Sequence, residues 1–183
     1  MNKNTIGLLE LNSIARGLEA TDAILKAADV DLVFARPCCP GKFMILFNGM
    51  VSAVDAALQA GKKTGGMSVV DHLLIARVHP DVIKGLYCTG DIQEGGTVGV
   101  MEFFSMTAAI NAADRALKSA EVSLLVLRLG IGLGGKSFAV ITGDSAAVES
   151  AIESALCDPA VKGLVVDTAI MSHPSPRLIE AIC

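Results

Sequence analysis

Residues 6–10 read Ile-Gly-Leu-Leu-Glu, and residues 98–102 read Val-Gly-Val-Met-Glu. The two stretches lie 92 positions apart, and the same offset relates several later positions. The matched pairs are Ser13 with Ser105, Asp22 with Asp114, and Lys26 with Lys118. Because the match extends along each half, the sequence predicts two copies of one fold, in residues 1–90 and residues 91–183. Repeats of this length are whole domains, unlike the units of about 20–50 residues found in solenoids.

Further along each half, the matches continue at an offset of 94. Gly41-Lys42 corresponds to Gly135-Lys136, and His79-Pro80 corresponds to His173-Pro174. A single change of two residues, between positions 36 and 41, accounts for both matches. The sequence therefore predicts that the copies differ in length at one loop, and that His79 and His173 occupy equivalent turns.

Each half is predicted to contain β-α-β-β-α-β and a terminal helix, the ferredoxin-like split arrangement of the α+β class (an α/β sandwich). Alternating and helix-spaced apolar residues set the expected boundaries. In the first half, strands are expected at 5–11, 30–36, 42–47 and 68–78, helices at 14–28, 51–60 and 81–86, and a loop at 61–66. In the second half, strands are expected at 97–103, 122–129, 137–142 and 164–170, and helices at 105–119 and 146–156.

The composition is strongly aliphatic, with 52% hydrophobic and only 19% charged residues. This favours an extensive oligomer interface, since obligate interfaces resemble a core cut in half; a compact pair of aliphatic domains is the alternative. A net charge of -4 gives no basic footprint for nucleic acid, and no apolar run reaches the ~18 residues of a membrane span. We expect no signal peptide, and five cysteines without framework spacing indicate the reducing cytoplasm.

Residues 130–137 match the nucleotide-binding string G-x-x-x-x-G-K-S. A phosphate-binding loop requires a helix directly after it, because the helix N-terminus and loop amides hold the phosphates. Residues 138–142 instead alternate like a strand. We therefore interpret Gly132, Gly134 and Gly135 as part of a glycine-rich connection that lets backbones approach closely. A nucleotide-binding enzyme remains the alternative.

Cys38 and Cys39 lie in the matching loop of the first half. Adjacent side chains of an extended segment point to opposite sides, so one chain cannot easily direct both sulfurs at one metal. A single cysteine becomes a metal ligand when rotational symmetry gathers copies of it around an axis. The alternative is two ordinary thiols. The remaining cysteines, Cys88, Cys157 and Cys183, are interpreted as structural or incidental.

Other polar residues recur in both halves. Glu10 and Glu102 could perform general acid–base chemistry, although equivalent positions in a repeat more often share a structural role. Lys26 and Lys118 each follow an aspartate by four residues, which suits either a solvated ion pair or a contact at a subunit edge. His79 and His173 are interpreted as turn residues at subunit contacts, and we assign no catalytic residue and no enzymatic activity.

Each half resembles a bacterial microcompartment shell domain of the non-permuted tandem type. The resemblance rests on the residues 13–17 and 22–28, the shared Gly-Lys after the second strand and the late His-Pro. It implies a homotrimer that imitates a hexamer and tiles with other shell proteins. It also implies that Lys26 and Lys118 lie at the subunit edge.

The resemblance is greatest to tandem shell proteins of propanediol-utilisation compartments. Their pore loop reads Cys-Pro-Gly-Lys-Phe, which begins here at Cys39 and includes Pro40, Gly41 and Lys42. It implies an iron–sulfur cluster of the 4Fe-4S type, one per trimer, held at the threefold axis by Cys39 of each chain. Cys38 departs from the pattern and is the alternative ligand. An enclosed redox enzyme is the expected partner.

Two further hypotheses stay open beside the iron–sulfur interpretation. One is a purely structural shell tile with an open metabolite pore, and the other is a small regulatory protein that binds a metabolite between subunits. The sequence leaves undecided the enclosed pathway, the cluster type and its fourth ligand, and the face exposed to the cytosol.

Overall fold

The computed structural model describes residues 4–86 and 96–182. Contacts divide the chain into two compact units, Met1–Val78 and His79–Cys183. The domain boundary expected between residues 90 and 91 lies outside the described residues. Within the described ranges, no helix is long and apolar enough to cross a lipid bilayer.

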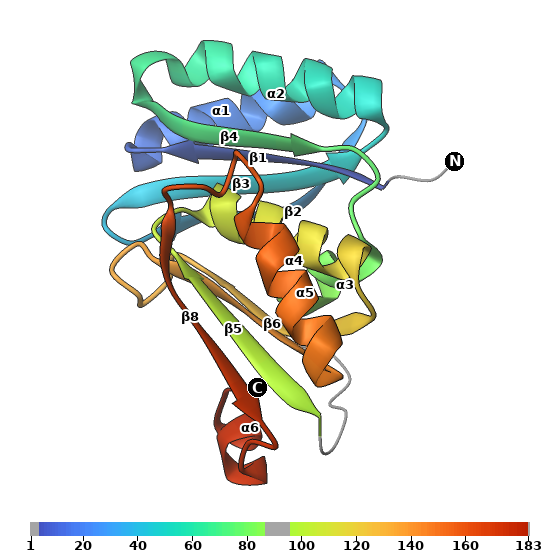
Figure 1. The fold of residues 1–183 in the computed structure, drawn as a ribbon. Helices are drawn as coiled ribbons and strands as arrows, with labels where there is room; N and C mark the ends of the chain where they lie inside the picture. The colour runs from blue at the N-terminus through green and yellow to red at the C-terminus, as the bar shows by residue number, and fades with distance from the viewer. Residues whose placement is uncertain (1–3, 87–95, 183) are drawn as a thin grey trace. The chain divides into compact units, whose positions relative to one another are not determined.

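The first unit is a four-stranded antiparallel sheet with two helices on one face (Figure 1). Its strands pair in the order β2-β3-β1-β4. The elements are β1 (Thr5–Leu11), α1 (Ile14–Ala27), β2 (Val30–Cys38), β3 (Lys42–Gly49), α2 (Val51–Gly65), the short 3-10 helix η1 (Gly66–Ser68) and β4 (Val69–Ile75).

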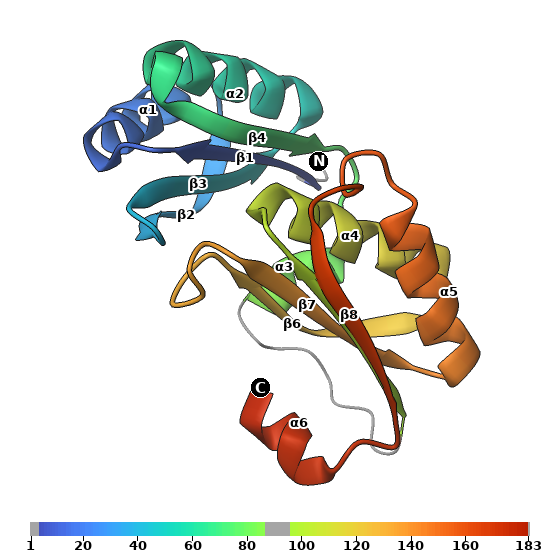
Figure 2. The same cartoon turned by 60° about the vertical axis from the view of Figure 1, so that its left-hand side comes forward.

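The second unit repeats this arrangement, with strand order β6-β7-β5-β8 (Figure 2). It begins with α3 (Pro80–Leu86), which follows β4 in sequence and packs against β6 and α4. The other elements are β5 (Thr97–Phe103), α4 (Met106–Ser119), β6 (Val122–Leu129), β7 (Ser137–Gly143), α5 (Ser145–Leu156), β8 (Val165–Ser172) and α6 (Pro176–Ile182). The predicted α+β class and the ferredoxin-like order of elements are confirmed in both units.

Equivalent serines start the first long helix of each unit. The Ser13 hydroxyl accepts a hydrogen bond from the backbone N–H of Arg16 at 3.3 Å, and Ser105 accepts one from Ala108 at 3.4 Å. These caps satisfy one of the backbone N–H groups that a helix leaves free at its start. The helices therefore begin at the same place in the repeat.

The helix-facing core differs between the two units at one pair of positions. In the first unit Gly17 faces Phe43 so closely that a Cβ atom on Gly17 would collide with the Phe43 ring and its Cβ. In the second unit the counterparts are Ala109 and Ser137, both fully buried. The first unit thus combines a glycine with a large ring, and the second combines a methyl group with a small side chain.

The expected end of the second helix was wrong. A loop was predicted at 61–66, but α2 continues to Gly65. Gly61 and Gly65 are buried, and a Cβ atom on either would lie 2.7 Å from side-chain carbons of Ile24 or Leu11, respectively. These glycines serve close packing within the helix rather than a turn. The strand predicted at 68–78 is shorter, since β4 ends at Ile75.

The expected equivalence of His79 and His173 was also wrong. Leu11 pairs with Val69, whereas its counterpart Phe103 pairs with Val165, so the last strands are related by an offset of 96. The terminal helices α3 and α6 share this offset. It also relates Arg77 to His173, the two non-glycine residues with positive φ (55° and 51°) among those described.

The cause is an additional change in length before β8, which begins 20 positions after the start of α5, whereas β4 begins 18 positions after the start of α2. The two His-Pro dipeptides therefore occupy different positions in the two copies of the fold. His173 is the structural counterpart of Arg77, and Ser175 is the counterpart of His79.

Candidate cofactor loop and subunit edge

The turn between β2 and β3 presents the cysteine pair. Cys38 ends β2 and pairs with Lys42, which begins β3. Cys39, Pro40 and Gly41 make the connection. The Cys39–Pro40 peptide bond is cis, and Gly41 has a φ of +80° that favours glycine. The chain thus reverses direction over three residues at the end of the two strands.

The two cysteines differ in environment. Cys38 is 6% exposed, whereas Cys39 is half-buried. Burial, reinforced by the nearby Glu10 carboxylate, raises the pKa of the Cys38 thiol from 9.0 to about 11. Since the thiolate is the form that ligates metals, Cys38 is poorly suited as a ligand near neutral pH. Cys39 is the more accessible thiol of the pair.

Each Gly-Lys lysine pairs with the glutamate on the first strand of its unit. Lys42 Nζ lies 2.6 Å from Glu10 Oε1, and Lys136 Nζ lies 2.5 Å from Glu102 Oε1. Glu10 is almost fully buried, so the lysine compensates a carboxylate that would be costly to bury alone. This pairing favours the structural interpretation of the two glutamates over acid–base chemistry. No local sequence signal indicates this pairing, although both partners recur in both halves.

The connection between β6 and β7 is longer and rich in glycine. Four of its residues have positive φ, namely Gly130, Gly132, Gly134 and Gly135. The backbone N–H of Gly130 donates to the carbonyl of Lys136 at 3.1 Å, which closes the base of the loop. The strand β7 follows directly, so the helix that a phosphate-binding loop needs is absent here. The sequence string alone does not make a nucleotide site.

Along residues 4–86 and 96–182, no group of three or more His, Cys, Asp or Glu side chains could hold a metal ion. The cysteine loop therefore supplies thiols singly. A multi-iron cluster would fit this donor set only where copies of Cys39 from several chains converge. The half-buried Cys39, on a tight turn at a sheet end, is compatible with such convergence, and the buried Cys38 is less so.

The lysines expected at a subunit edge form ion pairs with the aspartates that precede them by four residues. Lys26 Nζ lies 2.6 Å from Asp22 Oδ2, and Lys118 Nζ lies 2.5 Å from Asp114 Oδ2. The first pair is exposed, whereas Asp114 is buried and also accepts a hydrogen bond from the backbone N–H of His79 at 2.7 Å. The predicted i,i+4 ion pairs are confirmed, and a contact between subunits stays a prediction.

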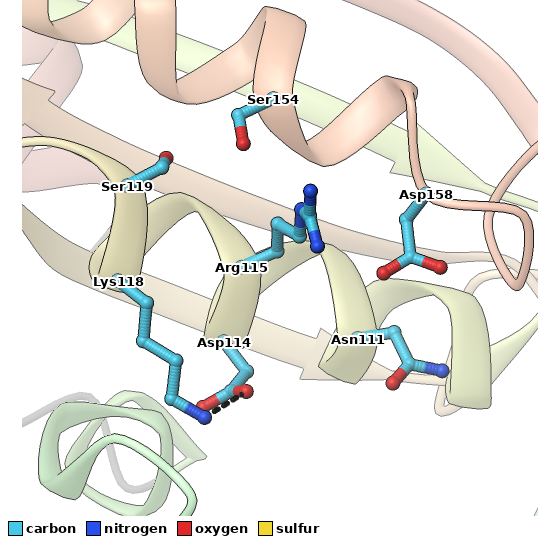
Figure 3. Close-up of a pocket in the computed structure, with 7 residues that line it drawn as sticks. All are labelled: Asn111, Asp114, Arg115, Lys118, Ser119, Ser154 and Asp158. Carbon is cyan, nitrogen blue, oxygen red and sulfur yellow. Dashed lines mark hydrogen bonds and ion pairs between the residues drawn. The ribbon is translucent and has the colours of Figure 1, made fainter.

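Lys118 and Asp114 border an open polar groove of about 410 Å³ on the surface of the second unit (Figure 3). Its other lining residues come from α4, from α5 and from the turn that follows α5. They are Asn111, Arg115, Ser119, Ser154 and Asp158. The structure thus brings Lys118 and His79 together through Asp114. Lys26 lies on α1 of the other unit, and His173 lies in the exposed turn before α6.

A family model for the BMC domain matches residues 5–78 and again residues 97–174. The chain therefore belongs to the BMC domain family and carries two copies of the domain in tandem. Both matches coincide with the sheets and helices described above. This agrees with the family expected from the repeated motifs.

Among curated proteins, the chain is similar to the bacterial microcompartment shell protein PduT of Citrobacter freundii. The two are 38% identical over 169 residues, which cover 92% of each chain. It also resembles the carboxysome shell protein CcmK2 of Synechococcus elongatus, with 35% identity over 81 residues that cover 42% of this chain and 79% of the other.

Among solved structures, a microcompartment protein from Desulfitobacterium hafniense has a similar fold. It superposes with a TM-score of 0.89 at 42% identity, covering 96% of this chain and 98% of the other. The match spans both units, so the tandem architecture is shared along nearly the whole chain.

Proposed function

We propose that this chain is a structural shell protein of a bacterial microcompartment. Three copies form a ring of six BMC domains, and Cys39 of each copy contributes one thiolate to a 4Fe-4S cluster at the centre. The observation that carries the cluster proposal is the contrast between the two thiols: Cys39 is half-buried on the turn, whereas Cys38 is buried and retains its proton. A redox enzyme within the compartment is the proposed electron partner.

Three observations support the shell role. The chain contains two BMC domains, and relatives that match one or both of them are named as shell proteins. The composition is aliphatic, with 19% charged residues, which suits a chain that buries additional surface on assembly. Large apolar side chains also remain exposed on α1 and β2 of the single chain.

The cysteine loop has features suited to holding such a cluster. The tight turn at Pro40 and Gly41 fixes the backbone on which Cys39 lies. Lys42, the first residue of β3 after the loop, is held in place by its ion pair with Glu10. When bound, the cluster would supply one-electron transfer, with a potential set by exposure and by hydrogen bonds to its sulfurs. A fourth ligand is not assigned.

The rest of the proposed tile has no chemical role and acts through the shape of its central opening. A closed ring of identical contacts defines a central opening, whose width and lining select the solutes that pass. The glycine-rich loop at 130–136 is the repeat counterpart of the cysteine loop. In the proposed ring the two kinds of loop therefore alternate around the centre.

Anaerobic purification and cluster reconstitution test this proposal with two matched variants, Cys39→Ser and Cys38→Ser. We expect iron and sulfide at one cluster per three chains in the wild type and in Cys38→Ser, and neither above background in Cys39→Ser. A wild type that assembles but binds no iron would overturn the cluster and leave a tile with an open pore. Loss of iron in Cys38→Ser alone would overturn the assignment of Cys39.

A further inference from the structure

The first unit carries an exposed apolar surface on α1 and β2. We define the α1–β2 face by its four large apolar side chains, Ile14, Leu18, Leu25 and Leu32. Their exposed fractions are 43%, 59%, 44% and 40%. Isolated exposed apolar side chains are normal, but four on two neighbouring elements of one unit form a patch typical of an interaction site.

The second unit has the same surface, but there it is buried. At the repeat offset of 92, the four counterparts are Met106, Ile110, Leu117 and Leu124. Their exposed fractions are 2%, 0%, 7% and 1%. The repeat has thus conserved the apolar character of this face in both units, and within a single chain only one of the two is buried.

The helix α3 shows how one end of this face is covered. It packs on β6 and α4, and its Val82 is fully buried. Gly85 approaches Leu124 so closely that a Cβ atom on Gly85 would lie 2.5 Å from Leu124 Cδ2. At the start of α3, the backbone N–H of His79 donates to Asp114. One short helix therefore contacts both elements of the face.

The helix α6 is the counterpart of α3 in the second unit, but it is packed differently. The segments read Pro-Asp-Val-Ile-Lys-Gly-Leu and Pro-Arg-Leu-Ile-Glu-Ala-Ile. Leu178, the counterpart of the buried Val82, is 39% exposed. Ile182 packs against the apolar cluster on its own sheet, which holds α6 to its unit. The chain therefore ends with an anchored helix that presents an unburied leucine.

We propose that α6 of one copy docks on the α1–β2 face of a second copy, as α3 docks on α4 and β6. This inference deepens the proposed function, because it rests on the ring and names the contact that joins its members. The counterparts of the observed contacts place Leu178 on this face, Ala181 beside Leu32, and the backbone N–H of Ser175 near Asp22.

The resulting contact is head to tail: each copy offers α6 and receives the α6 of another. Contacts of this kind form closed rings when the rotation between copies closes. The occupant is a copy of this chain rather than an unrelated partner. The chain already contains one such contact, between α3 and the surface of α4 and β6, and α6 and the α1–β2 face are the repeat counterparts of its two sides.

Disulfide cross-linking tests the docking directly. We expect the double variant Leu32→Cys with Ala181→Cys to form, on oxidation, covalent dimers and trimers that migrate as a ladder and revert on reduction. Each single variant, which retains the five native cysteines, should give no ladder, and neither should Met67→Cys with Ala181→Cys, since Met67 is fully exposed outside the face. Peptide mapping should place the new bond between positions 32 and 181.

A second measurement uses Leu178→Asp, with Met67→Asp as its control, in sedimentation analysis. We expect Leu178→Asp to shift the mass from trimer toward monomer by at least tenfold in dissociation constant, with an unchanged circular dichroism spectrum. A trimeric wild type that neither cross-links nor responds to Leu178→Asp would overturn the docking alone. A bond within one chain would overturn it as well. A wild type that is monomeric at every concentration would overturn both the docking and the ring.

Discussion

The two units share one fold but differ in how much of the equivalent apolar face is buried within a single chain. Around α4 and β6 the apolar face is buried, and α3 forms part of its cover, whereas the equivalent face around α1 and β2 is exposed. The repeat therefore distinguishes the features that define the fold, which both units share, from the burial of the apolar face, in which they differ. Strand order and the starts of the first long helices are the same in both copies. The copies differ in how much apolar surface each leaves exposed.

A second difference lies inside the units. Gly17 with Phe43 and Ala109 with Ser137 are two solutions to the same packing problem, since each balances one larger side chain against one smaller one. The second solution carries a cost, because the Ser137 hydroxyl is buried with no hydrogen-bond partner. At this pair of positions the two cores have therefore diverged together, while the strand order has stayed the same.

The largest effect should come from placing a charge on the covered face. Leu124→Asp puts a carboxylate under α3, where Leu124 is 1% exposed, and we expect it to lower the free energy of unfolding of the second unit by about 3 kcal/mol or more. Leu32→Asp at the equivalent but exposed position should cost less than about 0.5 kcal/mol in a dilute, dissociated sample.

Denaturant unfolding followed by circular dichroism measures both variants. Because the chain has two units, the transition is fitted with an intermediate if the data require one. Equal losses in the two variants would show that the two faces are equally buried in solution, which would break the comparison.

An intermediate effect should come from the core difference. Gly17→Ala adds a Cβ atom against Phe43, and we expect it to lower the free energy of unfolding by about 1–3 kcal/mol, as overpacking does. The reverse change, Ala109→Gly, removes a methyl group from a helix interior and should cost about 1 kcal/mol. Thermal unfolding of the two variants measures the contrast. A neutral Gly17→Ala would mean that the Phe43 ring moves aside freely.

The smallest effect concerns the cysteine loop and depends on pH. Because the pKa of Cys38 is raised to about 11, its alkylation by iodoacetamide should remain slow at pH 8 and accelerate as pH approaches 11. The unfolded thiol ionises at lower pH than the folded one, so between about pH 9 and pH 11 the folded state holds more protons. The free energy of unfolding should therefore fall as pH rises through this window.

Mass spectrometry of peptides from anaerobic protein, in wild type and Cys39→Ser, assigns the modified residue. Alkylation of Cys38 as fast as that of unfolded protein at pH 8 would contradict its burial. The same measurement in Cys38→Ser reports Cys39 alone and provides the matched control for accessibility.

Much of the fold could be predicted because local signals and the repeat agree. Ser13 and Ser105 cap equivalent helices, and the alternation in 97–103 and 122–129 gives the strands β5 and β6 with the expected bounds. Strand periodicity after residue 137 also excludes the nucleotide loop. These signals are local, so a single sequence contains them.

The errors have a different origin, since they depend on contacts distant in sequence. Gly61 and Gly65 suggest a loop until Ile24 and Leu11 are seen packed against them. The His-Pro dipeptides match as letters, but strand pairing shows that His173 corresponds to Arg77. The ion pair of Glu10 with Lys42 likewise joins two strands, and only the register reveals it.

The unequal connections after β2 and β6 have a consequence for evolution. A chain with one domain presents the same connection in every copy of an assembly, so any change there appears in all copies at once. With two copies in one chain, one connection can carry cysteines while the other keeps its glycines. Duplication thus allows one kind of connection to change without altering the other.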